Sequence, residues 1–261
     1  MKIFIDSANL QDIENALKRG FIRGITTNPS ILAKEPKSGF KEHIKKIVAL
    51  IHQYQPDTHL SVEVFSQDTE EIIRQAHDFI KSFEHPQLSI KIQIGWNELE
   101  TIRRLSQEGI SINCTACMTV PQAVMAAAAG ARYVSLFWGR IRDLGLIEEK
   151  LKDQTLPQEK RAILVSHARL KQEYLSRGAL EERHFDPFFV VKHTREIMDR
   201  LYPDVEIIAG SMRSANDVKN AGLAGAHIVT ASPKFFPDMV SNFKTDEVVQ
   251  EFLTDFQKWL T

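Results

Sequence analysis

Eight short apolar or β-branched segments recur along the chain, and most of them are followed by a segment with helical periodicity. This alternation indicates right-handed β–α–β units and a parallel sheet. Eight consecutive units favour an α/β fold of the closed (β/α)8 barrel type, and no G-x-G-x-x-G follows the first segment to support an open dinucleotide-binding sheet. The expected strands are Lys2–Asp6, Arg23–Thr27, Leu60–Phe65, Leu88–Gln93, Ser111–Thr115, Tyr133–Phe137, Val205–Ala209 and His227–Ala231.

The regular spacing is broken once, between the sixth and seventh expected strands. One helical segment of this gap can serve as the crossover helix. The remainder, residues 144–186, is too small to hold a core of its own and is expected to be a helical insertion on the carboxyl-end face of the barrel. A single domain over residues 1–261 is therefore predicted. The helix-forming segments of the gap are Ile147–Lys152, Gln158–Arg177 and Phe188–Leu201.

The last segment, 244–261, has the pattern of an amphipathic helix. Apolar side chains recur at roughly helical spacing at Val249, Phe252, Phe256 and Trp259. Stripes of this kind most often pack on their own domain, so docking on the barrel is the expected arrangement. Contact with a second copy, in a homo-oligomer, is the alternative.

Composition excludes several classes of partner. The 261 residues are 43% hydrophobic, which is enough apolar material for one large core. A formal net charge of -1 argues against a general nucleic-acid binder, although it permits a small anionic ligand held by local cations. The amino terminus lacks the apolar run of a signal peptide, and no segment reaches the roughly 18 apolar residues needed to cross a bilayer. A cytoplasmic protein without nucleic-acid or membrane partners is therefore expected.

Polar side chains interrupt the expected strands at alternating positions, where a purely structural barrel would be filled with Val, Ile and Leu. Because side chains alternate across a strand, Ser89, Lys91 and Gln93 share one face of the fourth strand. They are expected to point into the lumen near the carboxyl ends of the strands, where active sites of this fold lie. The other residues assigned to the lumen are Asp6, Thr26–Asn28, Ser61, Glu63, Asn113, Thr115, Tyr133, Ser135 and Phe137.

Lys91 is flanked by Ile90 and Ile92 and is expected to be buried. Burial disfavours the ammonium form and lowers the pKa of a lysine, and the resulting amine can attack a ketone to form a Schiff base. The alternative is an ion pair with Glu63 or Asp6 that only fills the lumen. Periodicity alone does not separate the two interpretations. Two carboxylates beside one amine do suit proton transfer.

A second group of residues predicts an anion site. Arg140 follows the sixth strand, while Ser211 and Arg213 follow the seventh, just before a helical segment. Arginine side chains, a hydroxyl group and the amides of a helix N-terminus suit a phosphate monoester. Phosphate sites in this fold often lie after the last two strands.

Cys114 and Cys117 have the C-x-x-C spacing of redox and zinc sites. A structural zinc needs four ligands, and no second pair of cysteines exists. Buried apolar cysteines are therefore the better interpretation. We expect no metal and no cofactor.

The same residues carry a resemblance to a known family. The motifs are K-I-F-I-D-S-A-N-L at 2–10, G-I-T-T-N-P-S-I at 24–31, S-V-E-V at 61–64, I-K-I at 90–92, E-G-I-S-I-N-C-T at 108–115, G-A-R-Y-V-S-L-F-W-G-R-I at 130–141 and I-I-A-G-S-M-R at 207–213. In order and spacing they resemble the small transaldolases and fructose-6-phosphate aldolases. The resemblance covers nearly the whole chain except roughly 144–186. The chain departs from the usual pattern around the acceptor and phosphate end, at Gln93, Ala116–Thr119, Leu136 and Arg142.

This resemblance implies a role for each candidate residue. Lys91 would form the Schiff base with a ketose phosphate, and Asp6 would transfer a proton at the cleaved C3–C4 bond. Glu63 and Thr115 would hold the catalytic water. The residues implied for the dihydroxyacetone moiety are Asn28, Asn113 and Ser135, and those implied for the phosphate are Arg140, Ser211 and Arg213.

Two positions separate transferases from aldolases in this family. Glu63 and Phe137 are similar to the residues of transaldolases, whereas the aldolases carry Gln and Tyr there. The implied function is transfer of a dihydroxyacetone unit from sedoheptulose 7-phosphate or fructose 6-phosphate to glyceraldehyde 3-phosphate or erythrose 4-phosphate, in the pentose phosphate pathway. The alternatives are an aldolase that releases dihydroxyacetone, a transaldolase for another anionic sugar, and a catalytically silent barrel that binds partners through its insertion.

Overall fold

The computed structural model describes residues 1–36 and 39–260, and its strands form one closed parallel barrel. Neighbours in sequence are neighbours in space, and the eighth strand pairs with the first. The expected α/β barrel is confirmed, with strand ends within two residues of those predicted. The strands are β1 (Lys2–Asp6), β2 (Gly24–Thr26), β3 (His59–Glu63), β4 (Leu88–Gln93), β5 (Ile112–Cys117), β6 (Tyr133–Phe137), β7 (Glu206–Gly210) and β8 (Ile228–Ala231).

Helices cover the outside of the barrel, and most of them begin at a residue whose side chain caps the first turn. Asn9, Asp68, Asp186 and Ser214 each accept a hydrogen bond from an amide of the helix that follows, which satisfies a donor that has no partner inside the helix. The covering helices are α1 (Leu10–Lys18), α2 (Pro29–Leu32), α3 (Phe40–Tyr54), α4 (Thr69–Phe83), α5 (Trp96–Gln107), α6 (Val120–Ala128), α10 (Pro187–Leu201) and α11 (Ala215–Leu223).

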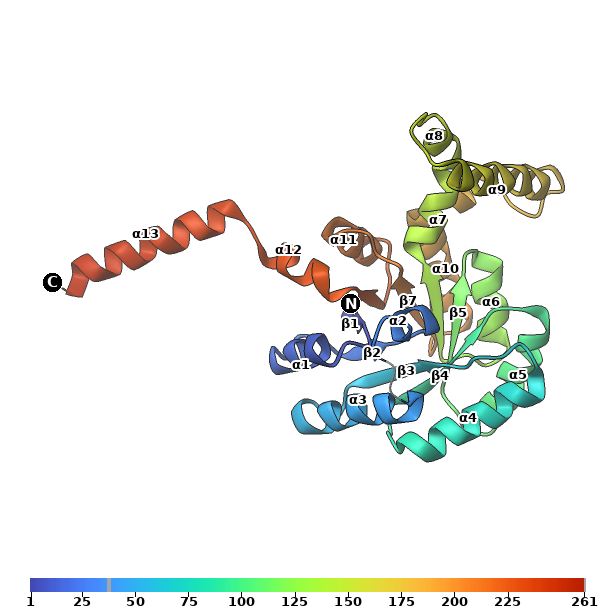
Figure 1. Ribbon diagram of the computed structural model, residues 1–261, viewed down its shortest axis with the longest axis horizontal. Coiled ribbons are helices and arrows are strands. Elements are labelled where there is room, and N and C mark those ends of the chain that lie inside the picture. Colours follow the sequence, from blue (N-terminus) through green and yellow to red (C-terminus); the bar gives the residue numbers. More distant parts are fainter. Residues whose placement is uncertain (37–38, 261) are drawn as a thin grey trace.

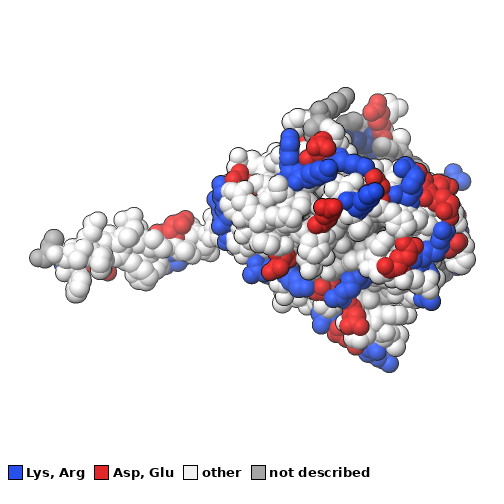
Figure 2. Space-filling view, turned by 90° about the horizontal axis from the view of Figure 1, so that it is seen from below, with Lys and Arg blue, Asp and Glu red and all other residues white. Residues whose placement is uncertain are grey.

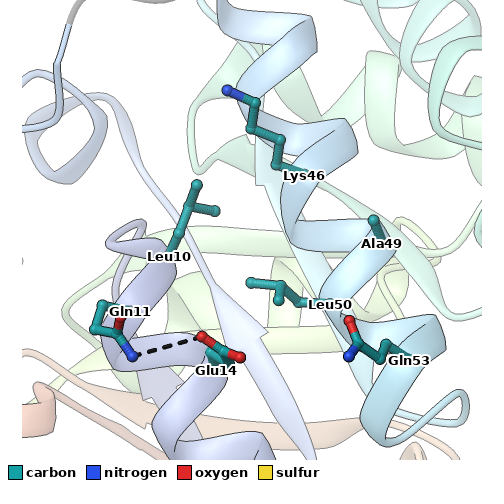
Figure 3. Close-up of a pocket in the computed structure, with 7 residues that line it drawn as sticks. All are labelled: Leu10, Gln11, Glu14, Lys46, Ala49, Leu50 and Gln53. Atoms are coloured by element: carbon teal, nitrogen blue, oxygen red, sulfur yellow. Dashed lines mark hydrogen bonds between the residues drawn. The ribbon is translucent and has the colours of Figure 1, made fainter.

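The main core lies between these helices and the outer faces of the strands. A smaller apolar cluster of Phe4, Ile208 and Ile228, with Tyr133 packed against it, occupies one part of the lumen. Gly24 leaves room for the Phe4 ring, because a Cβ at that position would overlap it. Outside the barrel, α1 and α3 pack side by side and leave a surface groove between them (Figure 3). That groove contains none of the residues assigned to the lumen.

The segment after β6 leaves the barrel. Helix α7 (Trp138–Gly145) runs outward from the strand, and α8 (Ile147–Leu151) and α9 (Gln158–Ser176) stand beyond it, clear of the strands (Figure 1). A short 3-10 helix, Glu182–Phe185, then returns to α7 before α10 provides the crossover to β7. The insertion was expected to lie on the carboxyl-end face. It follows the carboxyl end of β6 but projects away, because α7 carries it outward.

The last helix, α13 (Phe243–Leu260), does not dock on the barrel. A 3-10 turn and α12 (Phe236–Val240) end against the barrel, after which extended backbone at Ser241 directs α13 outward. None of the side chains described in α13 is buried, and Figures 1 and 2 show it projecting from the body. The expected docking on its own barrel is therefore wrong, because α13 points away from the barrel and its apolar stripe packs on no surface of the described residues. Among the described residues, no helix is long and apolar enough to cross a membrane.

Candidate active site

Lys91 lies in β4 inside the barrel and is 4% exposed. Its Nζ donates a hydrogen bond to the Thr27 carbonyl oxygen at 2.9 Å. The same Nζ lies 3.1 Å from Oε2 of Glu63, because the register of β3 and β4 places Glu63 directly beside Lys91. The ion pair that sequence analysis raised as an alternative is thus present. This ion pair does not by itself exclude a nucleophilic role for the Lys91 amine, because the reactivity of the amine also depends on the groups around the pair.

Asp6 ends β1 at the same mouth of the barrel. Thr26 Oγ1 donates a hydrogen bond to Asp6 Oδ1 at 2.8 Å, and Thr26 is itself 2.6 Å from the Thr230 hydroxyl. Burial raises the pKa of the Asp6 carboxyl, and the opposing charge of Lys91 does not offset that effect. A carboxyl group whose pKa is raised towards neutrality is suited to giving and taking a proton.

A chain of buried hydrogen bonds forms the floor beneath Lys91. Ser135 Oγ donates to Asn113 Oδ1 at 2.7 Å, and Asn113 Nδ2 donates to Ser61 Oγ at 3.1 Å. Ser61 is in turn 2.7 Å from Nε2 of His59, whose ring stacks on Phe4. Burial, together with the nearby histidine and lysine charges, lowers the pKa of His59 to about 3. The floor therefore fixes the orientation of the Asn113 amide without carrying a charge at neutral pH.

Thr115 lies one layer above Asn113 on β5. Its hydroxyl oxygen is buried and has no hydrogen-bond partner among the residues that the structure describes. The next residue, Ala116, has φ +61, and the pairing of β5 with β6 shifts between Cys114 and Cys117. Bulges of this kind often lie beside active sites and redirect a side chain. An unpaired buried hydroxyl group calls for a partner from solvent or ligand.

Asn28 and Phe137 sit at the rim of the lumen, each between a strand and a helix. Asn28 Oδ1 accepts a hydrogen bond from the Ile31 amide at 3.0 Å, so it caps α2 directly after β2. Phe137 is the half-buried last residue of β6, and α7 begins immediately after it. Both side chains are positioned by the element that follows the strand.

The three residues of the expected anion site lie around the start of α7. A Cβ on Gly139 would collide with the Ser211 carbonyl oxygen and crowd the Arg213 side chain, so only glycine permits this close packing. Ser211 itself has φ +61. Arg213 Nη2 pairs with Asp143 Oδ2 at 3.1 Å. Arg140 is exposed, and no hydrogen bond or ion pair holds its side chain among the described residues.

Asp217, which no sequence motif had indicated as part of the site, joins α7 to the loop after β7. Its carboxylate is buried and accepts hydrogen bonds from Arg142 Nη1 at 2.6 Å, from Trp138 Nε1 at 3.3 Å and from the Arg213 amide at 2.8 Å. The pattern Ser214-x-x-Asp217 signals a helix start, and Ser214 does cap α11. The contacts with α7 come from residues 75 and 79 positions away, which no local pattern reveals.

Cys114 and Cys117 are free, fully buried thiols. Contact with Cys114, together with burial, raises the pKa of the Cys117 thiol, which makes it a poor nucleophile. The interpretation as buried apolar cysteines is confirmed. Across residues 1–36 and 39–260, no cluster of three or more His, Cys, Asp or Glu side chains could hold a metal ion.

Fold and site together define a (β/α)8-barrel protein with a buried lysine–carboxylate centre at the carboxyl ends of its strands. Residues 3–260 match the family model described as transaldolase/fructose-6-phosphate aldolase, and the chain belongs to that family.

Relatives of similar length support this assignment. The chain is 34% identical over 260 residues to a probable transaldolase of Caldicellulosiruptor saccharolyticus, covering 99% of this chain and 98% of that protein. It is 31% identical over 257 residues to a probable transaldolase of Alkaliphilus metalliredigens, with 98% of both chains covered. A solved thiamine phosphate pyrophosphorylase from Pyrococcus furiosus is similar in fold alone, with a TM-score of 0.52, 11% identity, and 88% of this chain and 85% of that chain covered.

Proposed function

We propose that the protein is a transaldolase that moves a dihydroxyacetone unit from a ketose phosphate to an aldose phosphate through a Schiff base on Lys91. The observation that carries this proposal is the buried Lys91 amine, 3.1 Å from Glu63, in a lumen lined by hydroxyl, amide and carboxyl groups. Family membership supports the reaction class. Sedoheptulose 7-phosphate or fructose 6-phosphate is the proposed donor, and glyceraldehyde 3-phosphate or erythrose 4-phosphate the acceptor.

The covalent step requires Lys91 to lose a proton before it attacks the C2 ketone. Glu63 is the nearest carboxylate and can accept that proton, then return it as the carbinolamine loses water. Thr115, whose hydroxyl has no partner in the described part of the chain, is available to hold the departing water. The product of this step is an iminium ion on Lys91.

The cleavage step places negative charge on the oxygen at C4. Asp6 takes the proton of the C4 hydroxyl as the C3–C4 bond breaks, and the electron pair of that bond moves into an enamine on Lys91. The aldehyde product leaves, an acceptor aldehyde binds, and the enamine attacks its carbonyl carbon while Asp6 returns the proton. Hydrolysis then frees Lys91. The raised pKa of Asp6 suits both proton transfers.

The remaining lumen residues bind the substrate in this scheme. Asn28, Asn113 and Ser135 are proposed to hold the dihydroxyacetone moiety, and the floor of hydrogen bonds orients two of them. Phe137 and Glu63 favour transfer of the three-carbon unit over its release. The residues proposed to bind the phosphate are Arg140, Ser211 and Arg213.

Trapping with borohydride tests the covalent step. Reduction of the protein in the presence of fructose 6-phosphate should leave a three-carbon adduct on the peptide that contains Lys91. Lys171 is an internal control, because it is also buried and paired with glutamate but lies in the insertion. An adduct on Lys171, or none at Lys91, contradicts the proposal. A coupled assay for free dihydroxyacetone, with and without acceptor, separates transfer from release.

We further propose that α13 packs on a second copy of the chain. Its exposed apolar side chains include Phe252, Phe256 and Trp259. Contiguous exposed apolar patches on a protein surface often mark an interface. An apolar hollow between α1 and α12, at the base of α13, offers a surface of matching character. Light scattering measures the resulting mass directly.

A further inference from the structure

Gln93 is the half-buried last residue of β4, and no step of the proposed reaction uses it. It lies two residues beyond Lys91, so the two side chains emerge on the same face of the strand. The register of β4 and β5 places Gln93 beside Thr115, just as it places Lys91 beside Asn113. Gln93 and Thr115 therefore belong to the layer of the lumen next above the lysine.

The orientation of the Gln93 amide is fixed by two acceptors. Its Nε2 donates one hydrogen bond to the Ser66 carbonyl oxygen at 2.9 Å and another to Glu98 Oε1 at 3.1 Å. A carbonyl oxygen and a carboxylate only accept hydrogen bonds, so the nitrogen must face them and the amide cannot be reversed. Both hydrogens of the nitrogen are then used. The side-chain oxygen of Gln93 has no hydrogen-bond partner among the described residues and is still able to accept.

Glu98 anchors this amide from the first turn of α5. Its side chain is buried, and its carboxylate packs over Gly95, where a Cβ would collide with it. Ser66 belongs to the loop after β3, the strand that carries Glu63. Through the amide of Gln93, the loop after β3 and the start of α5 are thus held together at the mouth of the barrel.

Two complementary polar groups therefore lie on neighbouring strands above Lys91. One is the acceptor oxygen of Gln93, and the other is the Thr115 hydroxyl group, which is buried and has no partner in the described ranges. A water molecule bound between the two groups donates a hydrogen bond to Gln93 and accepts one from Thr115.

We propose that Gln93 holds, together with Thr115, the water that leaves and re-enters at C2 of the substrate. The inference rests on the proposed function. When the C2–O bond of the carbinolamine on Lys91 breaks, the departing oxygen takes the proton that Glu63 returns and becomes this water. In hydrolysis the same water attacks C2 of the iminium ion and gives a proton back to Glu63, so the two steps are the reverse of one another.

Oxygen exchange between water and the ketose measures these two steps apart from cleavage of the C3–C4 bond. Each round of Schiff-base formation and hydrolysis replaces the C2 oxygen of fructose 6-phosphate with one from heavy-oxygen water, which mass spectrometry detects against an enzyme-free blank. Asp6→Asn is the common background, because it suppresses the proposed cleavage step. In this background Gln93→Leu should slow the exchange about tenfold, the effect of losing one neutral hydrogen bond.

The anchor of the amide provides a graded series of variants. Glu98→Leu frees the amide and should slow the exchange by a smaller factor than Gln93→Leu. Glu98→Gln still accepts a hydrogen bond from the amide and should keep the parent rate. Gln87→Leu is the matched control, because Gln87 is an exposed glutamine just before the opposite end of β4. Affinity for fructose 6-phosphate, titrated by calorimetry in a Lys91→Met background, should be the same with Gln93 and with Leu at this position.

The outcomes separate this inference from the proposed function. An unchanged exchange rate in Gln93→Leu overturns the inference. A loss of ketose affinity as large as the loss of exchange also overturns it, because Gln93 would then support the structure of the site alone. If borohydride traps the ketose on Lys91 while Gln93→Leu exchanges oxygen at the parent rate, only this inference fails. If trapping fails and the parent protein exchanges no oxygen, the proposed function fails and this inference fails with it.

Discussion

Lys91 and Lys171 are both buried and both paired with glutamate, yet they belong to very different regions of the molecule. Lys171, in the insertion, is held between two exposed glutamates and an aromatic ring, so its contacts are complete. Lys91, in the barrel, has one partly buried glutamate and a carbonyl group, and it faces further polar groups across the lumen.

Burial and pairing are common to both lysines, so they do not by themselves identify the proposed nucleophile. Around Lys91 stand a carboxyl group of raised pKa and a buried hydroxyl group without a partner in the described residues. Around Lys171 the described residues include no comparable group. A site is indicated where polar groups converge and some of them lack partners. A purely structural ion pair, which was the alternative for Lys91, therefore describes Lys171 well.

The largest difference in activity is expected when the same substitution is made at Lys91 and at Lys171. Lys91→Met should lower the transfer rate about 10³-fold or more, because the proposed nucleophile is lost. Lys171→Met should leave that rate within a few-fold, since Glu148 and Glu182 stay solvated and the methionine still covers the Phe185 ring. Steady-state rates of both variants are the measurement. Comparable losses in the two would mean that Lys91 is structural as well.

Asp6→Asn should lower the activity of the protein while raising its stability at pH 7. The rate should fall about 10²- to 10⁴-fold, as for loss of a general acid–base group. The pKa of Asp6 is higher in the folded than in the unfolded state. Ionisation of this carboxyl therefore destabilises the folded state as the pH rises from the unfolded pKa through the folded pKa. The neutral amide of Asp6→Asn can still accept a hydrogen bond from Thr26 and should therefore give a higher melting temperature than the parent protein at pH 7. This increase in melting temperature should vanish near pH 4. A lower melting temperature at pH 7 would contradict this account.

The smallest effect is expected at the periphery, from removal of α13. Truncation after Val240 removes a helix that buries no side chain against the barrel, so the melting temperature of the monomer should change little. Its particle mass, measured by light scattering, should fall if α13 joins two copies. Polar substitutions at Phe252 and Phe256 are the matched control, because they keep the helix and remove its apolar stripe. An unchanged mass in both proteins would show that α13 has no role in assembly.

Much of the barrel could be predicted because it depends on local periodicity. Apolar runs located the eight strands, and alternation placed Lys91, Glu63 and Asn113 on the inner faces where they are found. Alternation does not give distances between strands, so the hydrogen-bonded floor from His59 to Ser135 was out of reach. The Asp217 contacts were missed for the same reason.

The appended helices were harder to place. The stripe on α13 correctly indicated a helix, but periodicity does not tell which surface will cover an apolar face. The insertion was assigned to the correct end of the barrel, yet its direction depends on α7 continuing outward from Phe137. Lys171 then holds the insertion together by pairing with Glu148, which lies 23 positions away in the sequence, and with Glu182.

His59 keeps the floor of the barrel uncharged over a wide range of pH. With a pKa of about 3, its ring stays neutral from neutral pH down to strongly acidic solution. The floor therefore adds no charge as the pH falls, while the raised pKa of the Asp6 carboxyl acts at the mouth of the lumen. A pH–rate profile of this protein should thus contain no step from the histidine that lies beneath Lys91.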